Sequence, residues 1–117
     1  MISPEAVRLI AEHISSVEEL EILLLLRRFP EREWTVVQVK DRIKGTLASV
    51  ATRLEDLQSR GFLCRRNSRY RYDPWPDRES AIASVAEAYE HFPLAVIQLI
   101  FSSTAVKVKA GGKSRRN

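Results

Sequence analysis

The sequence predicts a mostly helical α+β protein in which a pair of short helices is followed by a small β-hairpin. Apolar residues recur at helical spacing along most of the chain, whereas a period of two is confined to residues 62–72. A length of 117 residues, with 44% hydrophobic and 29% charged residues, is typical of one globular domain. These three observations predict a small helical domain that carries one short sheet.

Two helices are predicted in the first 28 residues. Ser3-Pro4-Glu5 combines a hydroxyl N-cap, a proline at the first helical position and an acid near the positive end of the helix. The apolar face of this helix is predicted to be Val7, Ile10, Ala11 and Ile14. The second helix runs from Val17 to about Arg28, and it is apolar most of the way round, so we expect it at the centre of the domain.

A helix, a tight turn and a second helix follow between residues 35 and 61. Thr35 and Gln38 form a capping box that opens the first of these helices, and Lys44-Gly45 is the turn. Thr46 caps the next helix, and Gly61 ends it at a position that favours a left-handed residue. The buried stripe of this helix is predicted to be Leu47, Val50, Ala51, Leu54 and Leu57.

Residues 62–65 and 69–72 are predicted to be paired strands joined through Arg66-Asn67-Ser68, with a very short strand at Trp34. The period of two places Tyr70 and Tyr72 on one face of the second strand and its two arginines on the other.

The last predicted helix spans residues 77–104 and carries a heptad-like apolar seam. The seam consists of Ile82, Val85, Tyr89, Phe92, Val96 and Leu99. Pro93 interrupts the hydrogen bonding, but the seam keeps its phase, so we expect one long helix that is kinked at the proline. The predicted organisation is a domain over 1–76, this helix over 77–104 as a dimerisation element, and a basic disordered tail over 105–117.

The charge is sorted along the chain. The formal net charge is +4, but the residues from Lys107 onward hold five basic residues and no acid, which leaves 14 basic against 15 acidic residues elsewhere. Residues 60–71 contain five arginines and no acid. A basic patch on a nearly neutral domain indicates a local anionic partner better than uniform basicity does.

A helix–turn–helix followed by a hairpin is typical of the winged helix-turn-helix fold, which lays its second helix in the DNA major groove. The candidate groove-facing residues are Thr46, Ala48, Ser49, Thr52 and Arg53. The arginines of the hairpin, or wing, suit phosphate contacts, and they are Arg65, Arg66, Arg69 and Arg71. The alternative interpretations are a helical hairpin with a polar outer face and a solvated strand face.

Other chemistry is not indicated. The single cysteine, Cys64, excludes an internal disulfide and fits a reducing cytoplasm. His13 and His91 are far apart in sequence, and although Glu87 lies one helical turn before His91, two possible ligands without a third are a weak metal signal. No catalytic set of residues can be assembled, so we expect no metal, no cofactor and no enzymatic activity. No apolar run is long enough to span a membrane, and the N-terminus does not resemble a signal peptide.

The segment TVVQVKDRIKGTLASVATRLEDLQSRGFLCRRNSRYRYDP resembles the winged-helix core of small bacterial transcriptional regulators of the MarR and ArsR types. The resemblance implies a DNA-binding transcriptional regulator that contacts double-stranded DNA and forms a homodimer through its terminal helices. Metal sensing is not implied, because the paired cysteines of the metal-sensing members are missing from residues 36–41. An alternative is a winged-helix module that binds another protein without sequence-specific DNA binding, and a third hypothesis is peripheral membrane contact through residues 94–101 and the tail.

Overall fold

The computed structural model describes residues 2–103, which are mostly helical and include one two-stranded antiparallel sheet. The predicted mostly helical α+β class is confirmed at this level. The chain divides into two compact units, of which one is Glu18–Glu79 and the other joins the residues up to Val17 with those from Ser80 onward. Within residues 2–103, no helix combines the length and the apolar character needed to cross a membrane. The predicted tail, 105–117, lies outside the described residues.

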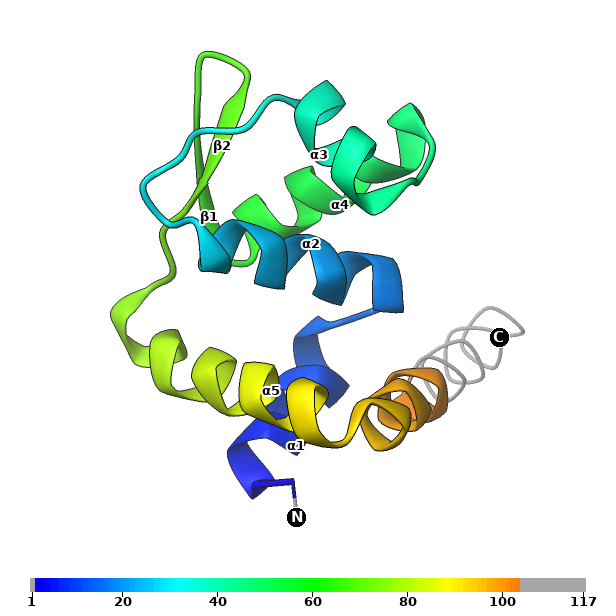
Figure 1. The fold of residues 1–117 in the computed structure, drawn as a ribbon. Helices are drawn as coiled ribbons and strands as arrows, with labels where there is room; N and C mark the ends of the chain where they lie inside the picture. The colour runs from blue at the N-terminus through cyan, green and yellow to red at the C-terminus, as the bar shows by residue number, and fades with distance from the viewer. Residues whose placement is uncertain (1, 104–117) are drawn as a thin grey trace, which may run out of the picture. The chain divides into compact units, whose positions relative to one another are not determined.

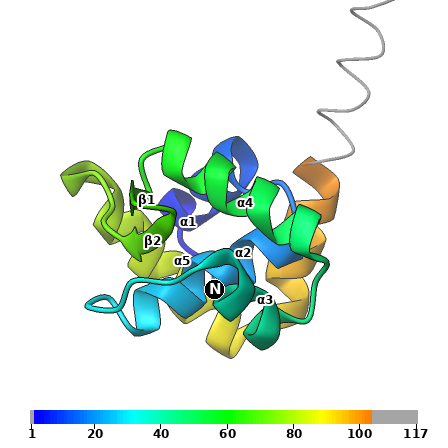
Figure 2. The same ribbon diagram turned by 90° about the horizontal axis from the view of Figure 1, so that it is seen from above.

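The Glu18–Glu79 unit holds most of α2 together with the elements that follow it. These are α2 (Val17–Arg28), α3 (Val36–Ile43), α4 (Leu47–Ser59), β1 (Leu63–Arg66), β2 (Arg69–Tyr72) and the 3-10 turn η1 (Pro76–Arg78). Within this unit, α4 contacts both α3 and β1. Figures 1 and 2 show α3 and the hairpin apart from each other.

Local capping fixes the helical pair. The backbone N–H of Thr35 donates to Gln38 Oε1 at 3.0 Å, and the N–H of Gln38 donates to Thr35 Oγ1 at 3.2 Å, which completes the predicted capping box. Lys44 adopts the left-handed conformation with φ 65°, and Thr46 Oγ1 then accepts the N–H of Ser49 at 3.1 Å. The predicted turn and both predicted helix starts are confirmed.

The core of this unit is apolar and is supplied by α2, α3 and α4 and, through Leu63 and Tyr70, by the hairpin. Its fully buried side chains are Leu20, Ile22, Leu23, Leu26, Trp34, Val39, Val50, Leu54, Leu57 and Phe62. Each such side chain contributes about 1.5–3 kcal/mol relative to exposure. The prediction that Leu47 is buried is wrong, because its side chain is 50% exposed. It occupies the first turn of α4, beyond the end of the buried stripe.

Gly61 connects α4 to the hairpin. Its φ of 85° is left-handed, and the N–H groups of Gly61 and Phe62 bond to the carbonyls of Gln58 and Leu57 at 3.2 and 3.0 Å. This is a Schellman ending, in which a side chain at the left-handed position is disfavoured. A Cβ at Gly61 would also overlap the indole of Trp75. The predicted glycine stop is confirmed.

The hairpin pairs Leu63 with Tyr72 and Arg66 with Arg69. Its loop consists of Asn67 and Ser68, both with positive φ (52° and 67°), as a two-residue type I′ turn requires. The loop is therefore shorter than the predicted connection through Arg66-Asn67-Ser68. On the other edge of β2, Trp34 and Tyr70 exchange two backbone hydrogen bonds of 2.8 Å, so residue 34 extends the sheet by a single bridge.

The second unit contains α1 (Pro4–His13), α5 (Glu79–His91) from Ser80 onward and helical residues 93–103. The Ser3 cap is confirmed, since Ser3 Oγ accepts the N–H of Ala6 at 3.2 Å. The Glu5 carboxylate accepts hydrogen bonds from the hydroxyls of Ser80 and Ser84 at 3.2 to 3.3 Å. These contacts join residues more than seventy positions apart, so the unit boundaries differ from the 1–76 and 77–104 segments that the sequence predicts.

The prediction of one continuous kinked helix through Pro93 is wrong. The helix α5 ends at His91, Phe92 is not helical, and a new helix begins at Pro93 (Figure 1). The N–H of Phe92 still bonds to Ala88 O at 2.7 Å, and Phe92 O accepts the N–H of Val96 at 3.1 Å. Because proline has no N–H and its ring crowds the carbonyl four residues back, the hydrogen-bond ladder stops and restarts here.

Candidate functional site

The predicted groove-facing residues divide into two groups along α4. Thr46, Ala48 and Thr52 are exposed, and Thr46 is at the same time the helix cap. Ser49 and Arg53 are only partly exposed, and both point to one acid on another helix.

That acid is Glu18, in the first turn of α2. Its Oε1 accepts hydrogen bonds from Ser49 Oγ and from Arg53 Nε, the latter at 3.3 Å. A Cβ at Gly45 would overlap the same carboxylate, so the turn before α4 closes over it. Glu18 thus neutralises Arg53 and ties α4 and its preceding turn to α2.

The remaining outer face of α4 has little positive charge. Over residues 47–59 there is one arginine, Arg53, against two acids, Glu55 and Asp56. The exposed positions on the side away from the core are Ala48, Thr52, Glu55 and Ser59. Small residues permit close approach, but in this state the helix offers no unpaired cation for a phosphate or a guanine.

The hairpin differs from α4 in that most of its arginines form no ion pair among the described residues. Arg65, Arg66 and Arg69 are exposed, and within residues 2–103 none of them takes part in an ion pair. Arg71 is less exposed, and its Nη2 lies 4.0 Å from Asp73 Oδ2. Three of the four predicted wing arginines are therefore available to an anionic partner.

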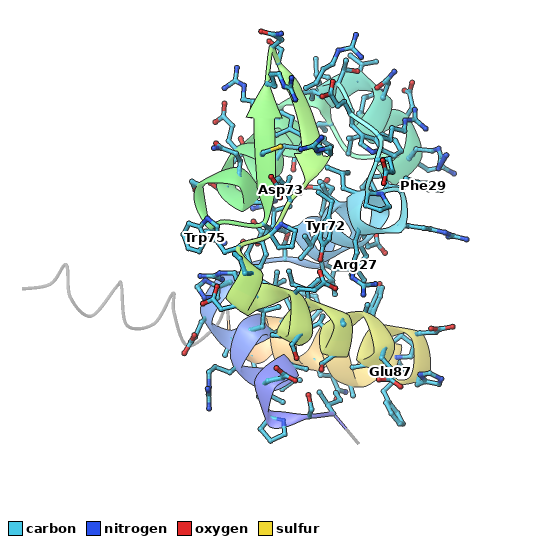
Figure 3. All side chains as sticks on the ribbon, turned by 90° about the vertical axis from the view of Figure 1, so that its left-hand side faces the viewer. Arg27, Phe29, Tyr72, Asp73, Trp75 and Glu87 are labelled. Atoms are coloured by element: carbon cyan, nitrogen blue, oxygen red, sulfur yellow. The ribbon has the colours of Figure 1, made fainter. Side chains whose placement is uncertain are left out.

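The inner face of β2 anchors the hairpin. Tyr70 is buried, and burial is the main cause that raises the pKa of its phenol. The Tyr72 hydroxyl donates to Glu79 Oε1, and Arg27 Nη2 lies 3.4 Å from Glu79 Oε2. Burial, followed by the hydrogen bond and charge of Glu79, raises the pKa of Tyr72. Figure 3 shows Tyr72 and Arg27 side by side below the hairpin.

The six predicted seam residues do not share one surface. Ile82, Val85 and Val96 are completely buried within the single chain, whereas Tyr89 and Leu99 are partly exposed and Phe92 is 45% exposed. The first three are unavailable to a second copy in this conformation, because the chain covers them already. Exposed apolar side chains continue beyond the seam at Leu94 and Phe101.

Sequence reasoning missed two features. One is Glu18, whose partners are 31 and 35 residues away. The other is a cluster of three exposed arginines, Arg28, Arg32 and Arg42, around the rings of Phe29 and Trp34. An excess of arginine next to two aromatic residues was the available signal, but the connection 31–33 also contains two acids that conceal it.

In the described part of the chain, no three His, Cys, Asp or Glu side chains converge in a way that could hold a metal ion. His91 Nδ1 lies 3.0 Å from the backbone oxygen of Glu87.

Comparison of the chain with family models, with curated proteins and with solved structures gives no match. The resemblance to MarR- and ArsR-type regulators therefore stays a prediction from the residues alone.

Proposed function

We propose that the Glu18–Glu79 unit is a winged helix-turn-helix that binds double-stranded DNA, and that the protein acts as a transcriptional regulator in the cytoplasm. In this proposal the β1–β2 hairpin is the wing, α4 is the recognition helix and α3 supports it. The order α3, turn, α4 and antiparallel hairpin supports the assignment of the fold.

The observation that carries the proposal is the set of unpaired arginines on the hairpin. The hairpin carries Arg65 and Arg66 on β1 and Arg69 on β2, all three exposed and free of ion pairs among residues 2–103, and these side chains give it a local positive charge. Such side chains release counterions when they bind phosphates, which provides affinity without sequence specificity. Specificity would have to come from Thr46, Ala48 and Thr52, which are exposed on α4.

The test replaces both arginines beside the turn with acids, in Arg66→Glu/Arg69→Glu, and measures binding to a random-sequence duplex by fluorescence anisotropy. We expect affinity at 100 mM salt to fall by at least about tenfold, because two phosphate contacts become repulsive. Arg8→Glu, a reversal on the exposed surface of α1, is the control. Equal affinities for the wild type and the hairpin variant, or no binding by the wild type, would refute the proposal.

A second candidate function is protein docking through α4. The specific observation is that Arg53 is bound by Glu18 while Glu55 and the apolar Leu47 are exposed on the same helix. A surface of this kind suits a protein partner better than it suits phosphate. Selection from a random duplex library at controlled salt separates the two functions, since sequence reading by α4 returns a motif and docking by α4 returns none.

A further inference from the structure

We propose a second phosphate-binding site for the backbone of double-stranded DNA, formed by Arg28, Arg32 and Arg42 around the ring pair Phe29–Trp34. This inference rests on the proposed DNA binding and extends it to a surface outside the hairpin and α4. We call this set the arginine cluster.

The aromatic pair assembles the cluster. The ring centroids of Phe29 and Trp34 are 6.2 Å apart. The guanidinium carbon of Arg32 lies 3.8 Å from the Trp34 centroid, and that of Arg42 lies 5.6 Å from it. The guanidinium carbons of Arg28 and Arg42 are each 5.8 Å from the Phe29 centroid. The end of α2, the following loop and α3 thus bring three cations to one pair of rings.

The cluster lacks internal neutralisation. All three arginines are exposed, and in the described residues none forms an ion pair, although Glu31, Glu33 and Asp41 are near in sequence. Stacking over a ring holds a guanidinium in place while its N–H donors stay available in the plane. Three like charges held together repel one another, and a bound anion relieves that repulsion.

The position of the cluster fits a continuation of the hairpin surface. Trp34 forms a β-bridge with Tyr70 on β2. Arg69 precedes Tyr70 in the chain, and Arg65 on β1 is paired with Tyr70. Adjacent strands are about 4.8 Å apart, so the bridge holds the loop before α3 directly beside the basic hairpin. Figures 1 and 2 show this loop passing next to the hairpin. In Figure 3, Phe29 lies at the opposite edge of the unit from Trp75.

The test measures how affinity for a random-sequence duplex depends on salt. Arg42→Gln removes one cation from the surface of α3 and leaves the contact between Arg32 and Trp34 intact. We expect affinity to fall about fivefold at 100 mM salt and the slope of log affinity against log salt to become shallower by about 0.9. Arg28→Gln/Arg42→Gln should double the change in slope. Arg8→Gln, the same charge change on α1, should leave the slope unchanged.

A gain of affinity provides a result that misfolding cannot imitate. Glu31→Gln removes an exposed acid next to the cluster, and we expect it to tighten binding about threefold, whereas Glu90→Gln on α5 should not. Two results together would show that the cluster is not a DNA site: the salt dependence of Arg42→Gln equals that of Arg8→Gln, and the affinity of Glu31→Gln equals that of Glu90→Gln. If the hairpin variant loses binding in the same experiments, the proposed function stands. If the wild type does not bind duplex DNA, both proposals fail.

Discussion

The arginines of α4 and of the hairpin lie close together in sequence but are used in opposite ways. Arg53 pairs with Glu18, and Arg60, at the end of α4, lies 3.4 Å from the fully buried Glu19. Arg65, Arg66 and Arg69 on the hairpin form no ion pair within residues 2–103. A count of basic residues therefore overstates the positive charge available to an anionic partner, because some of these residues stabilise the fold.

The sharpest stability contrast should come from Arg60 and Arg66. We expect Arg60→Ala to lower the free energy of unfolding by about 3 kcal/mol, because it removes a partner of a buried carboxylate. Arg66→Ala should change it by no more than about 0.5 kcal/mol, as is usual for an exposed position. Urea unfolding followed by circular dichroism measures both. Similar losses in the two variants would remove the distinction between structural and surface arginines.

Gly61 joins the two regions and should also be sensitive. Gly61→Ala forces a side chain into a left-handed position and against the indole of Trp75. We expect a loss of about 2 to 3 kcal/mol, from backbone strain together with overpacking. The measurement is again urea unfolding, with Ala48→Gly on the exposed face of α4 as a control that should cost about 1 kcal/mol. A Gly61→Ala protein as stable as the wild type would contradict the observed φ.

Features with a local cause could be predicted from the sequence. The capping box at Thr35, the cap at Thr46, the glycine stop at Gly61 and the two strands each depend on residues within a few positions, and the structure contains all of them. The extent of α2, from Val17 to Arg28, follows in the same way from the acids in its first turn, the arginines in its last turn and the apolar run between them.

Features that depend on distant residues could not be predicted. Leu47 is exposed because no other part of the described chain covers the first turn of α4. Arg53 is paired because Glu18, 35 residues away, lies next to it. The burial of half of the predicted seam has the same origin, because a heptad-like stripe fits the core of its own chain as well as a partner. A proline inside a helix can either kink the helix or divide it in two. The apolar residues keep their helical spacing on both sides of Pro93 in either case, so the spacing did not predict the break at Phe92.

The inner face of the hairpin should respond to alkaline pH. Because the pKa of Tyr72 is raised above its ordinary 10.0 in the folded chain, the phenol stabilises the fold below that pH, and the unfolded chain loses the proton first as the pH rises. We expect Tyr72→Phe to cost about 1 kcal/mol at pH 8, for the lost hydrogen bond to Glu79. Above pH 10 the difference between wild type and variant should shrink. A constant difference in urea unfolding from pH 8 to 11 would contradict the assignment.

The smallest effect concerns the ion pair between Arg53 and Glu18. Glu18→Gln keeps the shape of the side chain and an acceptor oxygen for Ser49, but it leaves the charge of Arg53 uncompensated. If α4 approaches DNA together with the hairpin, affinity for a random duplex should rise about threefold, because one more cation faces the phosphates. The double variant Glu18→Gln/Arg53→Gln should return affinity to the wild-type value, which shows that the gain acts through Arg53. An affinity unchanged by Glu18→Gln would mean that the hairpin binds DNA without α4, and the outer face of α4 would then be left to a protein partner.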